Sequence, residues 1–183
     1  MDKWIGVLIS VAIVAVAAWL MLRSWRRRTR RDESLTSYPL PAALGSFLLE
    51  TEVLYVATTP TGEPLERLAV HGLAFRGAAR IEIAAEGVVL RVAGESASFL
   101  PAERIVSAGE ASFAIDRGVE PEGLVAITWI AHVADPDARA PHVDSYLRAR
   151  YSGDSARIIA AVNDIAAARA ASRPEKESEA SDD

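Results

Sequence analysis

The feature that most constrains this chain is an uncharged stretch near its start, residues 4–22, with the sequence WIGVLISVAIVAVAAWLML. A helix of these 19 residues would rise about 28 Å, close to the roughly 30 Å hydrocarbon core of a bilayer. Ten of the 19 are Ile, Val or Leu, which favour insertion by about 0.3–0.6 kcal/mol each. The stretch therefore predicts a transmembrane helix at residues 4–22, with residues 1–3 as a short N-terminus outside the membrane.

Basic residues are strongly concentrated directly after this stretch. Only Lys3 and the α-amine precede it. The arginines that follow are Arg23, Arg26, Arg27, Arg28, Arg30 and Arg31. Positive residues favour the cytoplasmic side, so the sequence predicts a single-pass protein of the plasma membrane with the N-terminus outside and the remainder in the cytoplasm. These arginines are interpreted as topology residues that also contact anionic lipid, and no interleaved aromatic residues or basic face indicate nucleic-acid binding.

Two alternatives concern the same stretch. Ala15-Val16-Ala17 fits the small-x-small pattern at which a signal peptide is cleaved. Against cleavage, the apolar run continues to Leu22 and is followed at once by arginines, which resist translocation. Gly6 and Ser10 form a small-xxx-small pair that either seats a partner helix or is simply part of the span.

Net charge divides the chain into two parts. Residues 1–31 hold seven Lys or Arg and one Asp, a balance of +6, whereas residues 32–183 hold 13 and 24, a balance of −11. A basic head on an acidic body is typical of a membrane protein and argues against nucleic-acid contact by the body. The chain has no cysteine, which excludes a disulfide scaffold, a cysteine zinc site and a cysteine nucleophile.

The rest of the chain divides into three segments by composition. Residues 23–46 are expected to form a basic juxtamembrane segment and linker, because Pro39 and Pro41 favour extended backbone. Residues 47–171 are expected to form one folded domain. Residues 172–183 lack any apolar side chain larger than Ala and predict a disordered acidic tail.

Within the domain, short β-branched or alternating runs separated by Gly and Pro turns predict about seven strands, with a tight turn at Glu86-Gly87. The main runs are Glu50–Thr59, Arg80–Ala85, Val88–Ala93, Ser98–Leu100, Arg104–Ser107, Ser112–Asp116, Leu124–Val133 and Val143–Arg150. Asp154–Ala171 has apolar residues at helical spacing and predicts a helix, for which Ser152-Gly153-Asp154 would supply the N-cap. This order predicts a mainly β fold, a barrel of about seven strands closed by a C-terminal α-helix.

Five runs carry a resemblance to a known family: YVATT from Tyr55, LERLAVHGLAFRGAARIEI from Leu65, GVVLRVAG from Gly87, SFLPAERI from Ser98 and GLVAITW from Gly123. In these runs the chain resembles actinobacterial single-pass membrane proteins with a bacterial pleckstrin-homology-like domain. The resemblance implies a pleckstrin-homology-like fold and a setting among pyrimidine-biosynthesis genes, where such proteins are labelled transporters or export proteins. A single helix without charged residues provides no substrate path, so the transporter label does not fit this chain.

The sequence predicts no catalytic, cofactor or metal site, and therefore no enzyme. His132, Asp135, Asp137 and His142 match no known metal-ligand spacing. Many pleckstrin-homology domains bind phosphoinositides through basic residues of the first hairpin loop, but here that loop, residues 59–66, has two glutamates and no basic residue. The sequence therefore argues against phosphoinositide binding.

Four residues are the best candidates for a protein interface: His71, Arg67, Arg76 and Arg80. His71-Gly72 is also interpreted as a structural turn. The resulting hypothesis is a membrane-anchored, non-catalytic protein-interaction module that faces the cytoplasm, with an unidentified protein partner. The alternative hypothesis is an accessory subunit of a membrane transport or metabolic enzyme complex linked to pyrimidine metabolism.

Overall fold

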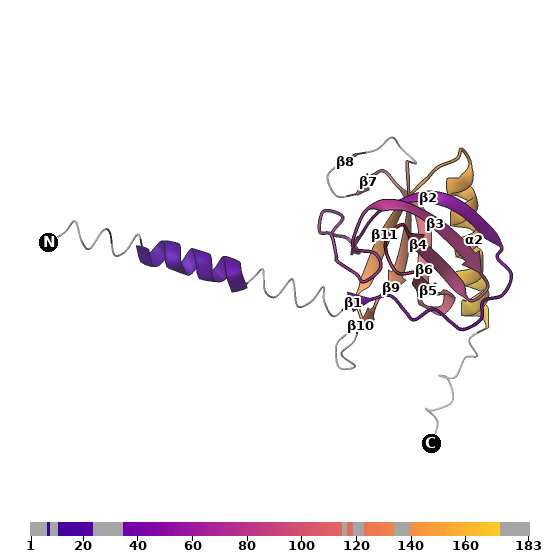
Figure 1. Ribbon diagram of the computed structural model, residues 1–183, viewed down its shortest axis with the longest axis horizontal. Helices are drawn as coiled ribbons and strands as arrows, with labels where there is room; N and C mark the ends of the chain where they lie inside the picture. The colour runs from indigo at the N-terminus through magenta and orange to yellow at the C-terminus, as the bar shows by residue number, and fades with distance from the viewer. Residues whose placement is uncertain are drawn as a thin grey trace, which may run out of the picture. The chain divides into compact units, whose positions relative to one another are not determined.

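The computed structural model describes residue 7 and residues 11–23, 35–114, 117–118, 123–133 and 140–172 (Figure 1). The chain forms two compact units, Met1–Ser34 and Leu35–Asp183. In the first unit, residues 11–23 are helical, and the Arg23 guanidinium lies 5.6 Å from the centre of the Trp19 ring. Among the described residues, no helix is both long enough and apolar enough to cross a membrane.

Several sequence predictions concern residues outside the part of the chain that the structure describes. The predicted span at residues 4–22 includes residues 4–6 and 8–10, which lie outside the described residues. The same holds for all the topology arginines except Arg23 and for residues 173–183 of the predicted tail.

The second unit is built on one antiparallel sheet of seven strands, in the order β5-β4-β3-β2-β11-β9-β6. Its strands are β2 (Leu49–Pro60), β3 (Gly77–Ala84), β4 (Gly87–Val92), β5 (Ser98–Pro101), β6 (Ile105–Ala111), β9 (Leu124–Ile130) and β11 (His142–Ala149). The long strand β2 joins the two halves of the sheet, because Leu49–Tyr55 pair with β3 and Val53–Pro60 pair with β11. The mainly β prediction is therefore confirmed.

Smaller elements complete the domain. Strand β1 (Leu35–Thr36) pairs with β10 (His132–Val133), and β7 (Phe113–Ala114) pairs with β8 (Arg117–Gly118). A short 3-10 helix, η1 (Ala102–Arg104), links β5 to β6. Helix α2 (Asp154–Ala171) ends the described chain and lies behind the strands in Figure 1.

The prediction of a closed barrel is corrected. In the described part of the chain, the hydrogen-bonded ladder ends at β5 on one side and at β6 on the other, and these two strands do not pair. Helix α2 instead packs beside β6 and η1 and buries Ile158, Val162 and Ile165. A strand at an open edge exposes unpaired backbone groups, so covering it with a helix substitutes for closing the barrel.

The core lies between the curved sheet and α2. Tyr55 and Trp129 are its largest fully buried side chains. Alternate residues of the strands face inward, as Ile81 and Ile83 do on β3, where both are completely buried. Burying one such side chain fully stabilises the fold by about 1.5–3 kcal/mol, so the inward-facing rows explain why the strand pattern of the sequence is so clear.

Two local predictions differ from the structure in detail. The turn between β3 and β4 is formed by Ala85 and Glu86, and Gly87 already belongs to β4. The expected strand 124–133 is interrupted at Ala131, which separates β9 from β10.

The helix predicted at Asp154–Ala171 is confirmed, but its N-cap is not as expected. Gly153 occupies the cap position with φ +83° and no side chain caps the helix. The Asp154 carboxylate instead accepts hydrogen bonds from Thr51 Oγ1 at 2.5 Å and from the Arg157 guanidinium at 2.9 Å. It thereby joins the start of α2 to β2, a tertiary contact that the local sequence does not encode.

The folded domain also begins earlier than the predicted boundary at residue 47. Leu35 is only 2 % exposed and belongs to the core, and Thr36 pairs with both His132 and His71. Tyr38 continues this contact by bridging to Phe99 of β5. Residues 35–38, here called the N-terminal strap, are therefore part of the domain rather than of a linker.

Candidate functional site

The loop between the paired strands β2 and β3 spans residues 61–76 and carries most of the predicted interface residues. It is longer than the hairpin loop predicted at residues 59–66, and because it contains Arg67 and Arg76 the prediction of a loop without basic residues is wrong. Its inner side is part of the core, because Leu68, Val70 and Leu73 are at most 1 % exposed. A loop that buries three apolar side chains is fixed on the sheet, since exposing them again would cost several kcal/mol. This loop therefore presents its outer side chains from a rigid base.

Hydrogen bonds tie the same loop to β2. The Arg67 guanidinium donates to the carbonyl oxygen of Val56 and, at 3.5 Å, to that of Ala74. The Leu68 N–H donates to the Thr58 carbonyl oxygen at 2.8 Å. Arg67, which the sequence analysis named as an interface candidate, thus also joins the two arms of the loop.

A buried series of hydrogen-bonded hydroxyl groups joins the loop to strands β2, β9 and β11. Trp129 Nε1–H donates to Ser145 Oγ at 2.9 Å, Ser145 and Thr58 hydroxyls lie 2.8 Å apart, and Thr58 and Tyr55 hydroxyls also lie 2.8 Å apart. Tyr55 donates its proton to the Leu73 carbonyl oxygen at 2.7 Å. Because indole N–H can only donate and a carbonyl can only accept, each hydroxyl donates in the direction from Trp129 to Leu73.

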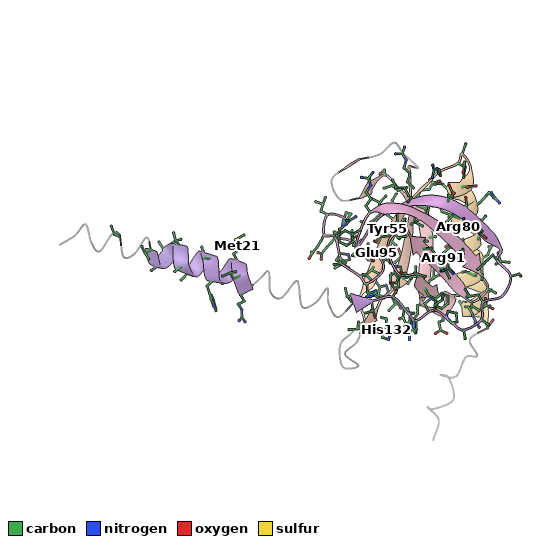
Figure 2. The ribbon with its side chains drawn as sticks, viewed as in Figure 1. Met21, Tyr55, Arg80, Arg91, Glu95 and His132 are labelled. Carbon is green, nitrogen blue, oxygen red and sulfur yellow. The ribbon has the colours of Figure 1, made fainter. Side chains whose placement is uncertain are left out.

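Burial determines the protonation of Tyr55. The side chain is completely buried, and burial raises the pKa of its hydroxyl far above the usual value of a tyrosine. The group is therefore a neutral donor that holds the loop, and Figure 2 shows Tyr55 within the strands of the sheet.

The outer side of the loop exposes two large apolar side chains. Leu65 is 67 % and Phe75 is 69 % exposed, the highest values for large apolar side chains among the described residues of the second unit. We call Leu65 and Phe75 the apolar loop pair. Arg76, next to Phe75, is exposed and makes no hydrogen bond or ion pair within the described chain. Apolar side chains held rigidly in solvent, with a cation beside them, are typical of protein-binding surfaces.

His71 and Gly72 form the turn at the far end of this loop. The His71 ring nitrogen Nδ1 lies 3.2 Å from Ser96 Oγ. Gly72 has φ +80°, and a Cβ atom added there would lie 2.4 Å from Ser98 Oγ and 2.9 Å from the Ser96 carbonyl oxygen. The position needs glycine both for its backbone conformation and for its space.

Arg80 lies apart from the other three interface candidates. It projects from β3 beside Arg91 of β4, its register partner, as Figure 2 shows. Its guanidinium forms an ion pair with Glu50 at 2.8 Å, while Arg91 binds Glu82 at 2.9 Å. The structure thus brings Arg67, His71 and Arg76 to one loop and engages Arg80 in cross-strand pairing.

His132, one of the two histidines of the cluster considered for metal binding, contacts Thr36 and Tyr38. His132 Nδ1 lies 3.0 Å from Thr36 Oγ1, and the ring packs edge-on against Tyr38 with centroids 5.1 Å apart. Within the described ranges, no three His, Cys, Asp or Glu side chains gather to hold a metal ion. Asp135 and Asp137 lie outside the described residues.

Both edge strands of the open sheet, β5 and β6, are hydrogen-bonded by other parts of the domain. On β5, the Tyr38 N–H donates to the Phe99 carbonyl oxygen at 3.2 Å. On β6, Asn163 of α2 accepts from the Ala108 N–H at 2.8 Å and donates to its carbonyl at 2.9 Å. A partner that adds a β-strand to either edge would have to displace these contacts.

A second surface feature surrounds the C-terminal end of α2, where three clefts of about 710, 340 and 490 Å³ share Arg169 in their walls. The sequence pattern predicted neither this region nor the apolar loop pair. For the pair, a usable signal was present, because Leu65 and Phe75 are large apolar residues within a stretch of turn-forming and charged residues.

Comparison with known protein families agrees with a folded domain that begins at residue 35. A family model described as "Bacterial PH domain-like" matches residues 35–163, which begin at the N-terminal strap and end within α2. No curated protein matches the chain. The family match covers well over half of the sequence and the whole seven-stranded sheet. The chain belongs to the bacterial PH-domain-like family.

Proposed function

We propose that this protein is a membrane-anchored, non-catalytic interaction module that binds a protein partner through the apolar loop pair. The observation that carries the proposal is the loop itself: it is fixed to the sheet by buried side chains and hydrogen bonds, yet it exposes Leu65 and Phe75 by about two thirds. Ordering such a surface costs little on binding, because it is already rigid.

The blocked sheet edges support a partner that docks through side chains. Tyr38 and Asn163 already satisfy the backbone groups of β5 and β6 at the contact points. Strand addition is a common way for a small β domain to bind a peptide. With both edges engaged, the exposed side chains of the loop are the better candidate surface.

The titratable groups of the described residues support a non-catalytic role. Burial raises the pKa values of Tyr38, Tyr55 and Tyr146, and a hydrogen bond from Thr51 lowers the pKa of Asp154. Each of these groups has a packing or hydrogen-bonding role in the fold. Of these four groups only Tyr38 lines one of the three clefts at the end of α2, whereas an acid and a base of an active site would line one cleft together.

Membrane anchoring and cytoplasmic orientation are the part of the proposal that rests on the sequence. The apolar stretch 4–22 would be the anchor, and the arginines from Arg23 to Arg31 would hold the domain on the cytoplasmic side. Because the domain begins at Leu35, a connection of 12 residues would extend at most about 40 Å. The partner would then itself lie at or near the membrane.

Anchoring and partner binding are tested separately. Reporter fusions at the C-terminus should give an inactive periplasmic phosphatase and a bright cytoplasmic fluorophore, and the opposite pair of results would contradict the orientation.

For binding, the full chain is cross-linked in isolated membranes and captured. Phe75→Glu should lose the wild-type partner, whereas Val106→Glu, at an exposed position on β6, should retain it. Equal capture by the two variants would contradict binding at the loop.

A further inference from the structure

The most apolar of the clefts at the end of α2 lies between that helix and the start of β2. It encloses about 490 Å³ and is lined by Leu48, Ala85, Ile165 and Ala168, with Asp164, Glu86 and Arg169 also in its walls. Leu48 is 62 % exposed at the edge of this cleft. Leu48 is thus an exposed apolar side chain that the same cleft on a second molecule would bury.

The helix end at this cleft leaves room for close approach. All residues of α2 from Ala167 onward are exposed, although the helix is buried at Ile158, Val162 and Ile165 further back. Alanines occupy most of these exposed positions, so another backbone can come close without a side-chain clash. Phe47, 43 % exposed, extends the apolar surface next to Leu48.

Charges of both signs surround this apolar centre. Asp164 and Arg169 are exposed and form no ion pair with each other or with another described residue. Five residues apart on one helix, they do not meet on the same face. Glu86 accepts a hydrogen bond from the Gly45 N–H at 3.2 Å. A twofold rotation about an axis that passes between Asp164 and Arg169 would place each charge opposite its counterpart in a second copy, with the two apolar centres facing each other.

We propose that a second copy of this chain docks on the α2-end cleft and forms a twofold symmetric dimer. Leu48 of each copy enters the cleft of the other, and Arg169 of each copy faces Asp164 of the other. In a twofold interface every contact occurs twice, so a modest patch gains two Leu48 contacts and two charge pairs. The proposal does not depend on membrane anchoring, although two chains confined to one membrane would meet at a higher effective concentration.

Cysteine cross-linking tests the contact directly, because the natural chain has no cysteine. Full-length Leu48→Cys and Ala168→Cys chains, each purified in mild detergent, are mixed and treated with a short bis-maleimide. The mixture should give a cross-linked dimer containing one chain of each kind. A mixture of Leu48→Cys with Phe75→Cys, an exposed position on the other surface, serves as the control. Equal yields from the two mixtures would overturn the proposal.

Exchanging the two charges tests the pairing, because recovery of dimerisation in the double variant would exclude misfolding as the cause of a loss in the single variants. Arg169→Glu and Asp164→Arg should each weaken dimerisation by roughly tenfold, as expected for two symmetry-related charge pairs, measured by sedimentation in the same detergent. The double variant, Arg169→Glu with Asp164→Arg, restores opposite charges across the axis and should recover most of the affinity. A double variant as weak as the single ones, or a dimer unaffected by any of them, would overturn the proposed interface.

Discussion

The side-chain amide of Asn163 bonds to the backbone of Ala108 in the way that a neighbouring β-strand would. Its Oδ1 accepts from the Ala108 N–H at 2.8 Å and its Nδ2 donates to the Ala108 carbonyl at 2.9 Å. Ala108 lies in β6, the last strand of the open sheet, and is 9 % exposed. One helical side chain thus satisfies two backbone groups that the missing strand pair would otherwise leave unbonded.

Removing this amide should destabilise the domain. Asn163→Ala leaves the Ala108 N–H and carbonyl without partners in a half-buried site, so the free energy of unfolding should fall by about 1–3 kcal/mol. Glu110→Gln, at an exposed position of the same strand β6, is the control and should change it by less than about 0.5 kcal/mol. Chemical denaturation of the full chain in detergent measures both, and equal stabilities would contradict the role of Asn163.

Gly72 should be far less tolerant of a side chain than Gly94. Both have positive φ, +80° and +86°, so alanine at either position carries backbone strain of about 1 kcal/mol. Only at Gly72 would the new Cβ also meet Ser98 Oγ and the Ser96 carbonyl, whereas nothing lies within 4 Å at Gly94. Gly72→Ala should therefore lower the thermal midpoint clearly more than Gly94→Ala. Similar midpoints would show that the turn can move.

Alkaline pH should destabilise the domain through Tyr55. Burial raises the pKa of its hydroxyl above that of an unfolded tyrosine, so above about pH 10 the unfolded chain loses this proton first. Below that pH the contribution of Tyr55 to the free energy of unfolding is fully present. Above it, the free energy of unfolding falls by about 1.4 kcal/mol per pH unit for one group. Tyr55→Phe should be less stable at pH 8 because Leu73 loses its donor, but its stability should decline less steeply between pH 10 and 12. Parallel profiles would contradict this assignment.

Acid pH should destabilise the domain through Asp154, which accepts a hydrogen bond from Thr51 near the start of β2. The hydrogen bond from Thr51, with smaller contributions from Arg157, lowers the pKa of the Asp154 carboxyl. A lowered pKa stabilises the fold above the usual value near 4 and loses this effect as pH falls below it. Thr51→Val should be less stable than wild type at pH 7, and the difference should shrink below pH 4. A difference independent of pH would mean that the ionised carboxylate is not what Thr51 stabilises.

Sequence patterns predicted the regular elements because their signals are local. Alternation such as that of Ile81 and Ile83 identifies a half-buried strand, and the spacing of Ile158, Val162 and Ile165 identifies the covered face of α2. The open sheet could not be predicted in this way. Whether β5 and β6 pair depends on the cumulative twist of seven strands and on Asn163, whose role is visible only when β6 lies beside α2.

The start of the domain and its surface were harder to predict for a similar reason. Leu35 is one apolar residue among polar ones, and only its contact with the core distinguishes it from a linker residue. Charge alone selected Arg67, Arg76 and Arg80 as interface candidates. It could not show that Arg80 is paired with Glu50, or that Leu65 and Phe75, in the same loop as Arg67 and Arg76, are exposed.

Site-specific photocross-linking from position 75 tests the central claim most directly. A photoreactive phenylalanine analogue replaces Phe75 in the full chain in living cells, and the same analogue at Val106 is the control, since both positions are exposed. The proposed binding surface predicts one defined protein adduct from position 75, absent from position 106 and lost when Leu65→Glu is added. Adducts of equal kind and yield from both positions, or none from position 75, would contradict the loop as the partner-binding surface.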